Sequence, residues 1–278
     1  MKDPHRVTRG MLARKFPLPP IDGDADKEER GSVLVVAGGT RVAGAAVLAG
    51  EATLRAGAGK LQIATAREAT MHVAIAVPES LVLPATASRV SRELREFSGA
   101  ADCVLIGPGL PEGAASVRMA RQIARRMKDE ATLVLDAAAL GAAGTRARCI
   151  ITPHSGEMAQ LLEVERADVD DDPEAAARTA SERFGGVCVL KGPRTFVASN
   201  EAMFLFDDGS PGLGTSGSGD VLAGTIAGLA TRGADPLTAA LWGVWAHAAA
   251  ARRAETRLGR LGLLARDLLR EIPSVLYG

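Results

Sequence analysis

A glycine-rich turn that ends on an acidic residue is the segment of this sequence with the clearest chemistry. The turn, Gly217-Ser218-Gly219-Asp220, runs directly into an apolar stretch that begins at Val221 and has the character of a helix. Backbone N–H groups at the start of a helix carry a partial positive charge, so such a turn can hold a phosphate group. A carboxylate in the first helical turn can take a proton from a substrate hydroxyl while those amides stabilise the transferred phosphoryl group. Asp220 is therefore the candidate catalytic residue, although a flexible turn followed by a favourable first-turn acid has the same pattern.

Three further polar residues follow short apolar runs of the kind that form buried strands. Lys191 comes directly after 187–190, where a cation can neutralise phosphates, although a lysine at a strand end is usually solvated. His154 precedes Gly156-Glu157, which open a helix, and it can contact a ligand or cap that helix. Asp136 can orient Mg²⁺ or a substrate hydroxyl, or it can cap the turn that follows it. Because open α/β sheets bind ligands beyond the carboxyl ends of their strands, we expect these residues to share one edge.

The remaining histidine, tryptophan and cysteine patterns favour structural roles. His247 lies in an apolar helical stretch, where a histidine is usually a core residue with its hydrogen bonds satisfied. Trp242 and Trp245 are three residues apart, hence on one helix face, and we expect them to pack in the core or against another subunit. The cysteines lie in short apolar runs without metal-ligand spacing, which predicts reduced structural thiols. They are Cys103, Cys149 and Cys188.

The order of the apolar segments predicts an α/β fold, a three-layer αβα sandwich with a mostly parallel central sheet. From residue 32 onwards short β-branched runs alternate with helical stretches, and each run is almost wholly apolar, as in strands covered by helices on both faces. Two last strands, 195–199 and 202–206, are separated by Asn200-Glu201 and predict a hairpin at one sheet edge, after which the chain is helical. The earlier predicted strands are 33–36, 61–64, 104–106, 133–135, 149–151 and 187–190, and the predicted helices are 44–56, 114–128, one from about 156, and 173–184.

Length and composition agree with one α/β domain that binds small molecules. We expect residues 31–278 to form this domain and residues 1–30, rich in proline and charge, to form an arm or a partly ordered cover. The 33 basic and 33 acidic residues give a formal net charge of zero, which argues against a protein that coats nucleic acid or an anionic membrane. No uncharged run approaches the ~20 residues of a membrane span. We therefore expect a cytoplasmic protein without nucleic-acid or membrane partners.

A set of short motifs spread over residues 31–272 resembles the ribokinase-like superfamily and, within it, the ADP/ATP-dependent NAD(P)H-hydrate dehydratases. The glycine turn that ends at Asp220 is typical of the whole superfamily. The turn Thr152-Pro153-His154-Ser155-Gly156-Glu157 and the triplet Gly107-Pro108-Gly109 together resemble the dehydratase branch. The other matching segments, in the same order and spacing, are 35–39, 44–46, 57–59, 78–79, 135–140 and 190–192.

The resemblance implies an enzyme that repairs hydrated NADH and NADPH. ADP or ATP would phosphorylate the ring hydroxyl, Asp220 would be the base on that hydroxyl, Mg²⁺ would bridge the phosphates, and loss of phosphate would restore the cofactor. Likeness to stand-alone bacterial forms favours ADP, and the family suggests a homotetramer. The implied substrate-binding residues are Ala45, Gly109, His154 and Asp220; the implied nucleotide-binding residues are Lys191, Gly192, Pro193, Arg194, Thr195, Gly217, Ser218 and Gly219; no protein ligand to a metal is implied.

Some positions and alternatives limit what the resemblance implies. The second acid of the family's D-A-D-A-L is Ala138, the asparagine before the proline of the glycine loop is Ser210, and Ser216-Gly217-Ser218-Gly219-Asp220 stands for G-G-T-G-D. A small-molecule kinase of the same fold, for a sugar or a vitamin precursor, would use the same loop and base. A catalytically silent subunit would bind a nucleotide without turnover. Many bacterial relatives have an epimerase domain ahead of this one, and 30 residues are too few for it, so we expect that activity from another chain.

Overall fold

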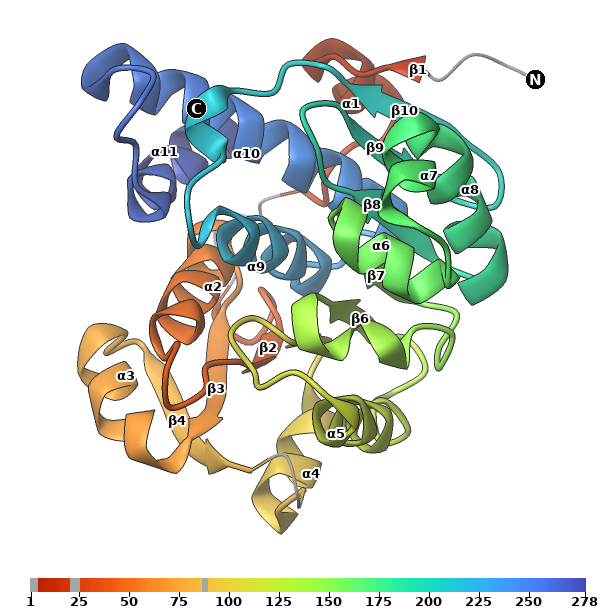
Figure 1. Ribbon diagram of the computed structural model, residues 1–278. Helices are drawn as coiled ribbons and strands as arrows, with labels where there is room; N and C mark the ends of the chain where they lie inside the picture. Colours follow the sequence, from red (N-terminus) through yellow and green to blue (C-terminus); the bar gives the residue numbers. More distant parts are fainter. Residues whose placement is uncertain (1–4, 21–25, 87–89) are drawn as a thin grey trace.

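Ten strands form one sheet at the centre of the computed structural model, which describes residues 5–20, 26–86 and 90–278 (Figure 1). The strands are β1 (His5–Arg6), β2 (Ser32–Val36), β3 (Lys60–Ala66), β4 (Ser80–Ala85), β5 (Cys103–Ile106), β6 (Thr132–Leu135), β7 (Cys149–Ile151), β8 (Val187–Leu190), β9 (Thr195–Ala198) and β10 (Met203–Phe206). Their order across the sheet is β1-β10-β9-β8-β7-β6-β5-β2-β3-β4. Neighbours are parallel except for the pairs β8 with β9 and β9 with β10, so the predicted hairpin is present near one edge.

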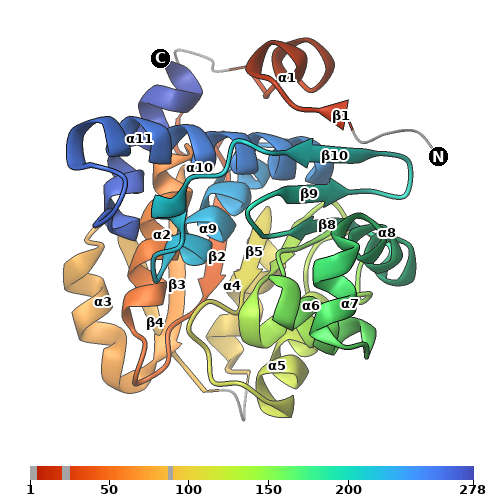
Figure 2. The same cartoon turned by 45° about the horizontal axis from the view of Figure 1, so that its top comes forward.

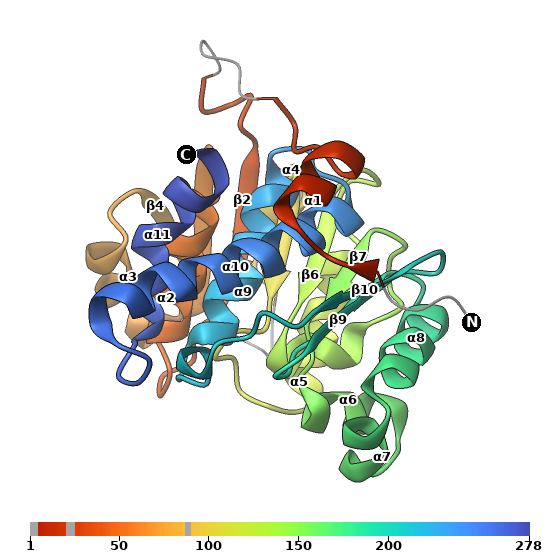
Figure 3. The same ribbon diagram turned by 90° about the horizontal axis from the view of Figure 1, so that it is seen from above.

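Helices cover both faces of the sheet. The α-helices are α1 (Arg9–Lys15), α2 (Gly44–Arg55), α3 (Thr70–Ala76), α4 (Arg92–Ala100), α5 (Ala114–Ala124), α6 (Ser155–Leu162), α7 (Arg166–Asp171), α8 (Pro173–Phe184), α9 (Ser218–Thr231), α10 (Pro236–Leu258) and α11 (Ala265–Tyr277), and the 3₁₀ helices are η1 (Arg67–Ala69), η2 (Ala137–Ala142) and η3 (Pro211–Leu213). Figure 3 shows α2, α9, α10 and α11 on one side of the strands and α5, α6, α7 and α8 on the other. Among the described residues, no helix combines the length and the apolar character needed to span a bilayer.

Alternate residues of the central strands pack into two separate hydrophobic cores. In β2, Val33 and Val35 belong to the core beneath α2, α9, α10 and α11, whereas Leu34 and Val36 belong to the core beneath α4, α5, α6 and α8. All four side chains are fully buried. This alternation is what a strand with helices on both faces requires. The predicted α/β class, a three-layer αβα sandwich with a mostly parallel sheet, is therefore confirmed.

The sequence did not predict the elements β4, α3 and α4, and helix α5 ends at Ala124 rather than at 128. Strand β4 is the last strand of the sheet on its side, and of its residues only Leu83 is buried. It also contains Pro84, which a strand tolerates at a sheet edge because no second neighbour needs its missing N–H. An edge strand of this kind lacks the continuous apolar run that marks the central strands.

Part of the N-terminal segment packs on the domain through helix α1. Leu12 is fully buried in the core beneath α10, and Trp242 Nε1 on α10 donates a hydrogen bond to the Phe16 carbonyl over 2.7 Å. Trp242 and Trp245 stack edge to face at 5.4 Å, so they do share a helix face (Figure 2 shows α1 above α10). Of the expected arm, residues 1–4 and 21–25 lie outside the described residues.

Close packing between α2 and α9 sets where the glycine turn lies. A Cβ on Gly224 would come within 2.3 Å of the Ala49 carbonyl oxygen, and one on Gly228 within 2.4 Å of the Thr53 carbonyl oxygen. Only glycine at both positions allows the backbones of the two helices to approach this closely. The start of α9 is thereby fixed beside the start of α2, at the carboxyl edge of the sheet.

Candidate active site

The ends of five parallel strands lie in register at one edge of the sheet. Val36, Ile106 and Leu135 are paired across β2, β5 and β6, and Ile151 and Cys188 continue the row on β7 and β8. The residues that follow these positions therefore lie along the carboxyl edge, which is where open α/β sheets bind their ligands. The structure brings the polar residues identified from the sequence together at this edge.

Two glycine loops, after β2 and β5, are joined by backbone hydrogen bonds. The N–H of Gly38 donates to the Pro108 carbonyl over 2.8 Å, and that of Gly39 donates to the Gly109 carbonyl over 2.7 Å. Gly109 has a φ of +63°, and a Cβ on it would lie 2.6 Å from the Cβ of Ala45 on α2. Both the left-handed backbone and this contact require glycine at 109. Ala45 and Gly109 are therefore direct neighbours.

Lys191 and Asp136 form an ion pair beyond the ends of β8 and β6. Lys191 Nζ lies 2.9 Å from Asp136 Oδ1, which also accepts a hydrogen bond from Thr152 Oγ1 over 2.7 Å. Only 19% of the Lys191 side chain and 4% of the Asp136 side chain are exposed. Burial acts to lower the pKa of Lys191, but the carboxylates of Asp136 and Glu157 outweigh burial and raise it. The idea of a solvated strand-end lysine is therefore wrong, as is the idea that the Asp136 side chain caps η2, because it makes no capping hydrogen bond.

His154 caps helix α6. Its Nδ1 accepts hydrogen bonds from the backbone N–H groups of Gly156 at 3.0 Å and Glu157 at 3.2 Å, while Glu157 Oε2 accepts the N–H of His154 at 2.8 Å. This reciprocal arrangement is a capping box. With Nδ1 accepting, a neutral ring carries its proton on Nε2, and 60% of the side chain is exposed. The capping role suggested from the sequence is thus present, and Nε2 is still available to a ligand.

The glycine turn places Asp220 in the first turn of α9, as the sequence predicted. Gly217 precedes the helix with a φ of +88° and contributes no side-chain cap. The Lys191 ammonium lies beside this turn, because a Cβ on Gly219 would be 3.4 Å from Nζ. Burial, together with the negative charge of Asp136, raises the pKa of Asp220 to about 7, and Lys191 acts against this shift. A carboxylate with such a pKa can accept a proton near neutral pH.

His247 on α10 forms hydrogen bonds with the first turn of α9. Its Nε2 lies 3.1 Å from Ser218 Oγ and 3.0 Å from the Ser218 carbonyl oxygen. Burial lowers the pKa of His247 to about 4, so the ring is neutral at physiological pH. The expectation of a satisfied core histidine is confirmed. Its contact with Ser218 in the glycine turn was not predicted, since only the fold brings positions 29 residues apart into contact.

The segment 192–194 connects β8 to β9, which begins at Thr195, and it lies against the loop that precedes the glycine turn. A Cβ on Gly209 would be 2.6 Å from the Pro193 carbonyl oxygen, so the two loops touch through their backbones. Gly192, Pro193 and Arg194 are exposed, and the Arg194 guanidinium lies 5.7 Å from the Phe196 ring centroid. Of the residues that the resemblance assigned to the nucleotide, Lys191 is the one that reaches the turn at 217–219, through its contact with Gly219.

The cysteines do not contribute to this site. All three are buried and free of disulfides, as predicted. Burial raises the pKa of Cys149 to about 12 and also raises the pKa values of Cys103 and Cys188. Thiols of this kind react poorly because the nucleophilic form is the thiolate.

The fold and this edge define the chain as a ribokinase-like α/β protein. A ribokinase-like superfamily protein of Enterococcus faecalis has a similar structure, with a TM-score of 0.85 over 97% of this chain and 94% of that one. At 23% identity this likeness shows the fold alone.

Sequence comparison places the chain more narrowly. The model of a family described as NAD(P)H-hydrate dehydratase matches residues 33–274, and the chain belongs to this family. It is 44% identical to the ADP-dependent (S)-NAD(P)H-hydrate dehydratase of Xanthomonas campestris, over 98% of this chain and 96% of that protein. It is 28% identical to the ADP/ATP-dependent NAD(P)H-hydrate dehydratase of Bacillus subtilis, co-crystallised with ATP and Mg²⁺, with a TM-score of 0.85 over 99% of each chain. Bifunctional NAD(P)H-hydrate repair enzymes also match, and the chain spans about half the length of these relatives.

Proposed function

We propose that this chain dehydrates hydrated NADH and NADPH at the expense of ADP or ATP and so restores the intact cofactors. The observation that carries the proposal is the position of Asp220, partly buried at the start of α9 with a pKa raised to about 7. It stands at the carboxyl edge of a chain that matches the dehydratase family from residue 33 to 274. A base with this pKa is suited to take the proton of a substrate hydroxyl at neutral pH.

The adenine nucleotide binds along the surface made by 191–195 and 217–219. The backbone amides at the start of α9 face the transferred phosphoryl group, and Lys191 lies beside the same turn with its charge maintained by Asp136. Such a lysine neutralises phosphate charge without needing to move, because its ammonium is already held. Glycine at 217 and 219 leaves no side chain between the backbone and the phosphates.

The hydrated nicotinamide ring binds between the glycine loops and α9. Ala45 and Gly109 form a small apolar wall, and His154 Nε2 offers a hydrogen-bond donor from the α6 end of the site. Asp220 takes the proton of the ring hydroxyl while the hydroxyl oxygen attacks the terminal phosphorus of the nucleotide. The bond from that phosphorus to the rest of the nucleotide breaks. ADP then leaves as AMP, or ATP as ADP. Loss of a proton from the neighbouring ring carbon, with departure of phosphate, forms the double bond of the reduced nicotinamide.

We propose that Mg²⁺ binds to the protein together with the nucleotide. Among the described residues, no group of three or more His, Cys, Asp or Glu side chains could hold a metal ion. Asp136, the acid paired with Lys191, already accepts hydrogen bonds from Lys191 and Thr152. Mg²⁺ usually keeps several waters and binds through substrate phosphates, so a dedicated protein cage is unnecessary. When bound, it would neutralise charge on the phosphates.

The departures at 138 and 210 do not favour a silent subunit. Ser210 Oγ accepts a hydrogen bond from the Gly212 N–H over 3.0 Å and thereby caps η3, a role that serine and asparagine both perform well. Ala138 lies within η2, two residues after Asp136, and removes a possible polar contact without disturbing the ion pair of Asp136 with Lys191. The groups that this mechanism uses are therefore all present.

The test is product analysis with purified protein. Hydrated NADH is incubated with Mg²⁺ and either ADP or ATP, and recovery of reduced-nicotinamide absorbance is followed together with free phosphate. We expect one phosphate released for each cofactor restored. A stable phosphorylated product without recovery would instead indicate a kinase, and nucleotide binding with neither product would indicate a silent subunit. Asp129→Asn, on an exposed loop after α5, is the matched control for Asp220→Asn. It loses the same negative charge and is purified in the same way.

A cytoplasmic homotetramer is part of the same proposal. The three buried, reduced thiols are compatible with a reducing compartment, and the family resemblance supports the tetramer. Sedimentation velocity of the purified chain tests the oligomeric state directly. A single species at the mass of a monomer would contradict it.

A further inference from the structure

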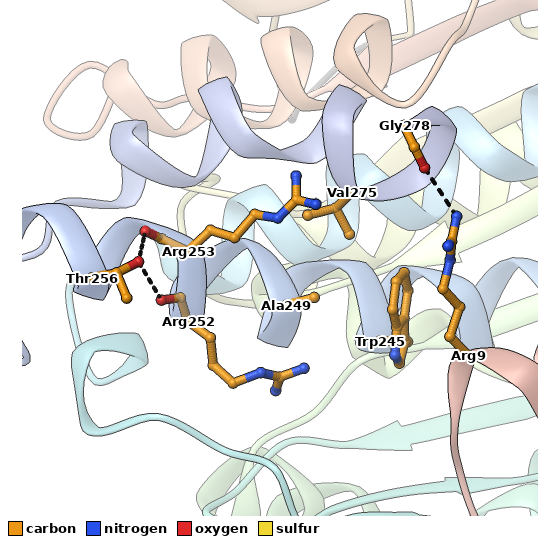
Figure 4. A pocket seen from close by; sticks show the side chains of 8 residues that line it. All are labelled: Arg9, Trp245, Ala249, Arg252, Arg253, Thr256, Val275 and Gly278. Carbon is orange, nitrogen blue, oxygen red and sulfur yellow. Dashed lines mark hydrogen bonds between the residues drawn. The ribbon is translucent and has the colours of Figure 1, made fainter.

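A hollow of about 380 Å³ opens between α1, α10 and α11, and we call it the arginine hollow (Figure 4). It is lined by Arg9, Trp245, Ala249, Arg252, Arg253, Thr256, Val275 and Gly278. The volume falls within the range of roughly 300 to 1,000 Å³ that small-molecule pockets occupy. Figure 4 shows the guanidinium groups of Arg252 and Arg253 reaching out from α10, with Arg9 beside Trp245.

The arginine hollow lies on the side of α10 that faces away from the candidate active site. The five lining residues of α10 stand at 245, 249, 252, 253 and 256, a spacing that places them on one helix face. His247, which contacts Ser218 in the catalytic turn, lies two residues after Trp245 and hence on the opposite face. The two sites are therefore separated by the body of the helix.

The charge of the arginine hollow is one-sided. Three of its lining side chains are guanidiniums and none of them is acidic. Arg253 donates to the neutral Ser274 Oγ over 2.6 Å, and Arg252 has Asp208 Oδ2 at 3.5 Å in a pair that is about half exposed. Arg9 donates to the Gly278 carbonyl oxygen over 3.2 Å and lies 6.0 Å from the Trp245 ring centroid. Asp208 therefore offsets part of the Arg252 charge, whereas Arg253, bonded to a neutral hydroxyl, keeps its positive charge for a ligand.

We propose that the arginine hollow binds a small phosphate-bearing molecule. A guanidinium presents five N–H donors in a planar fork that matches phosphate oxygens, and three of them around one concavity suit a group that carries more than one negative charge. The Thr256 hydroxyl donates to the Arg253 carbonyl over 2.6 Å, so the donors are the guanidiniums, while Trp245, Ala249 and Val275 provide an apolar floor for the rest of the ligand. The phosphate can belong to an inorganic anion or to a nucleotide, and both sources share this chemistry.

Tryptophan fluorescence reports on this site through Trp245, which also stacks edge to face on Trp242 at 5.4 Å. The chain has two tryptophans, of which Trp245 lines the hollow, whereas Trp242 is only 4% exposed and is bonded to the Phe16 carbonyl. The probes are inorganic phosphate, pyrophosphate and ADP, each titrated into the whole chain at constant ionic strength. Arg253→Gln is the principal variant, because Arg252 also holds the Asp208 carbonyl at 3.2 Å and its loss would disturb the glycine loop. Arg270→Gln, exposed on α11 outside the hollow, removes the same charge and is the matched control.

We expect a saturable fluorescence change with pyrophosphate, at least about tenfold weaker in Arg253→Gln and unchanged in Arg270→Gln, because a charge-assisted hydrogen bond is lost only in the former. Arg9→Gln, on a different helix, should weaken the same binding. A response to ADP that survives in Lys191→Met and is weakened by Arg253→Gln would identify a nucleotide as the source of the phosphate. A response to pyrophosphate and inorganic phosphate without ADP would identify an inorganic anion.

Three results would overturn the proposal. One is the absence of a saturable response to any of the three probes up to millimolar concentration. Another is equal binding by the wild-type chain and Arg253→Gln, since the anion would then bind elsewhere. The third is a Trp245 signal that changes with protein concentration alone and follows self-association in sedimentation, because a second copy of the chain would then cover the hollow.

Discussion

The loops after β2 and β5 are held by backbone hydrogen bonds and tight glycine contacts, whereas the loops after β6, β7 and β8 are held by charged side chains. The first group, which we call the glycine half, comprises Gly38, Gly39, Ala45 and 107–109. The second, the charged half, comprises Asp136, Thr152, His154, Lys191 and Asp220. In the glycine half a Cβ on Gly107 would lie 1.7 Å from the Asp136 carbonyl oxygen, so backbone meets backbone directly. In the charged half the contacts are an ion pair and the hydrogen bonds around it.

The glycine half determines the shape of the site, whereas the charged half determines its proton chemistry. The glycine half cannot tune a pKa, because it carries no titratable side chain, but the close contact between Ala45 and Gly109 fixes the shape of the backbone there. The charged half sets the charge at Asp220 through two neighbours of opposite sign, Asp136 and Lys191. Substitutions in the two halves should therefore change different kinetic parameters.

Asp220→Asn should have the largest effect and should abolish turnover without unfolding the chain. Removing a general base lowers kcat by about a thousandfold, and nucleotide binding should persist because 191–195 and 217–219 are unchanged. The measurement is steady-state kinetics with hydrated NADH beside equilibrium binding of ADP. Activity within a few fold of the wild-type value would remove Asp220 from the mechanism.

The same variant should also be more stable than the wild type above pH 7. The folded pKa of Asp220 is about 7, above the ordinary value of 3.8, so the carboxyl favours folding below 3.8 and loses that contribution as the pH rises through 7. Replacing the buried carboxylate with a neutral amide should therefore raise the unfolding free energy at pH 8 by about 1–3 kcal/mol. Urea unfolding of both proteins measures this, and a less stable variant at pH 8 would contradict the raised pKa.

Gly109→Ala should affect substrate recognition and leave proton transfer alone. The added Cβ would meet the Ala45 Cβ at 2.6 Å and the Val42 carbonyl oxygen at 2.8 Å, so the loop must move by a fraction of an ångström. Such a displacement should raise KM for the hydrated cofactor about 10- to 100-fold, with little change in KM for the nucleotide or in the pH dependence.

A matched control for this variant exists in the chain. Gly185, which ends α8, has a φ of +65°, almost the same as the +63° of Gly109, but a Cβ there would have nothing within 4 Å. Gly185→Ala should therefore show the cost of the left-handed backbone, about 1 kcal/mol, without any kinetic effect. If both variants changed KM equally, the contact between Gly109 and Ala45 would have no role in recognition.

The contrast between the two halves also explains what the sequence could predict. The carboxyl ends of β2, β5, β6, β7 and β8 were predicted at the right residue, because buried parallel strands have a continuous apolar signature and glycine marks the loops between them, whereas β3 ends at Ala66 rather than at 64. Edge strand β4 was missed because its residues are only partly buried. In the charged half the residue types were identified, but the partners were not, since Asp136 and Lys191 are 55 positions apart and only sheet register brings them together.

The arginine hollow could not be predicted from the sequence for the same reason. Arg9 lies in a segment expected to be an arm, and nothing in its composition indicates that α1 packs against α10 and contributes to a pocket. Long arginine side chains on a helix surface are usually solvated, so it takes the three-dimensional structure to show that these line one hollow. Sequence patterns thus report burial and backbone shape better than they report which charges meet.

Asp136→Asn and Lys191→Met should shift the pH profile in opposite directions. Asp136 raises the pKa of Asp220 and Lys191 lowers it, so removing the negative neighbour should move the acid limb of kcat/KM to lower pH and removing the positive neighbour to higher pH. A shift of about one pH unit each way is expected from a single neighbouring charge. Lys191→Met should also raise KM for the nucleotide, which Gly109→Ala should not. Shifts in the same direction would show that the pair does not act on Asp220 through its charge.

His247→Gln should have the smallest effect, and it tests whether the charged half depends on a neutral residue beneath it. The folded pKa of His247 is about 4 and its ordinary value is 6.5, so its contribution to stability is complete above pH 6.5 and is lost as the pH falls towards 4. Between pH 6 and pH 5 this one group should remove about 1 kcal/mol of unfolding free energy. The glutamine variant, which can still reach Ser218 but cannot titrate, should lack this part of the slope, whereas His72→Gln, on exposed α3, should keep it. Equal slopes for the two variants in urea unfolding would mean that protonation of His247 is not what loosens the turn at Ser218 in acid.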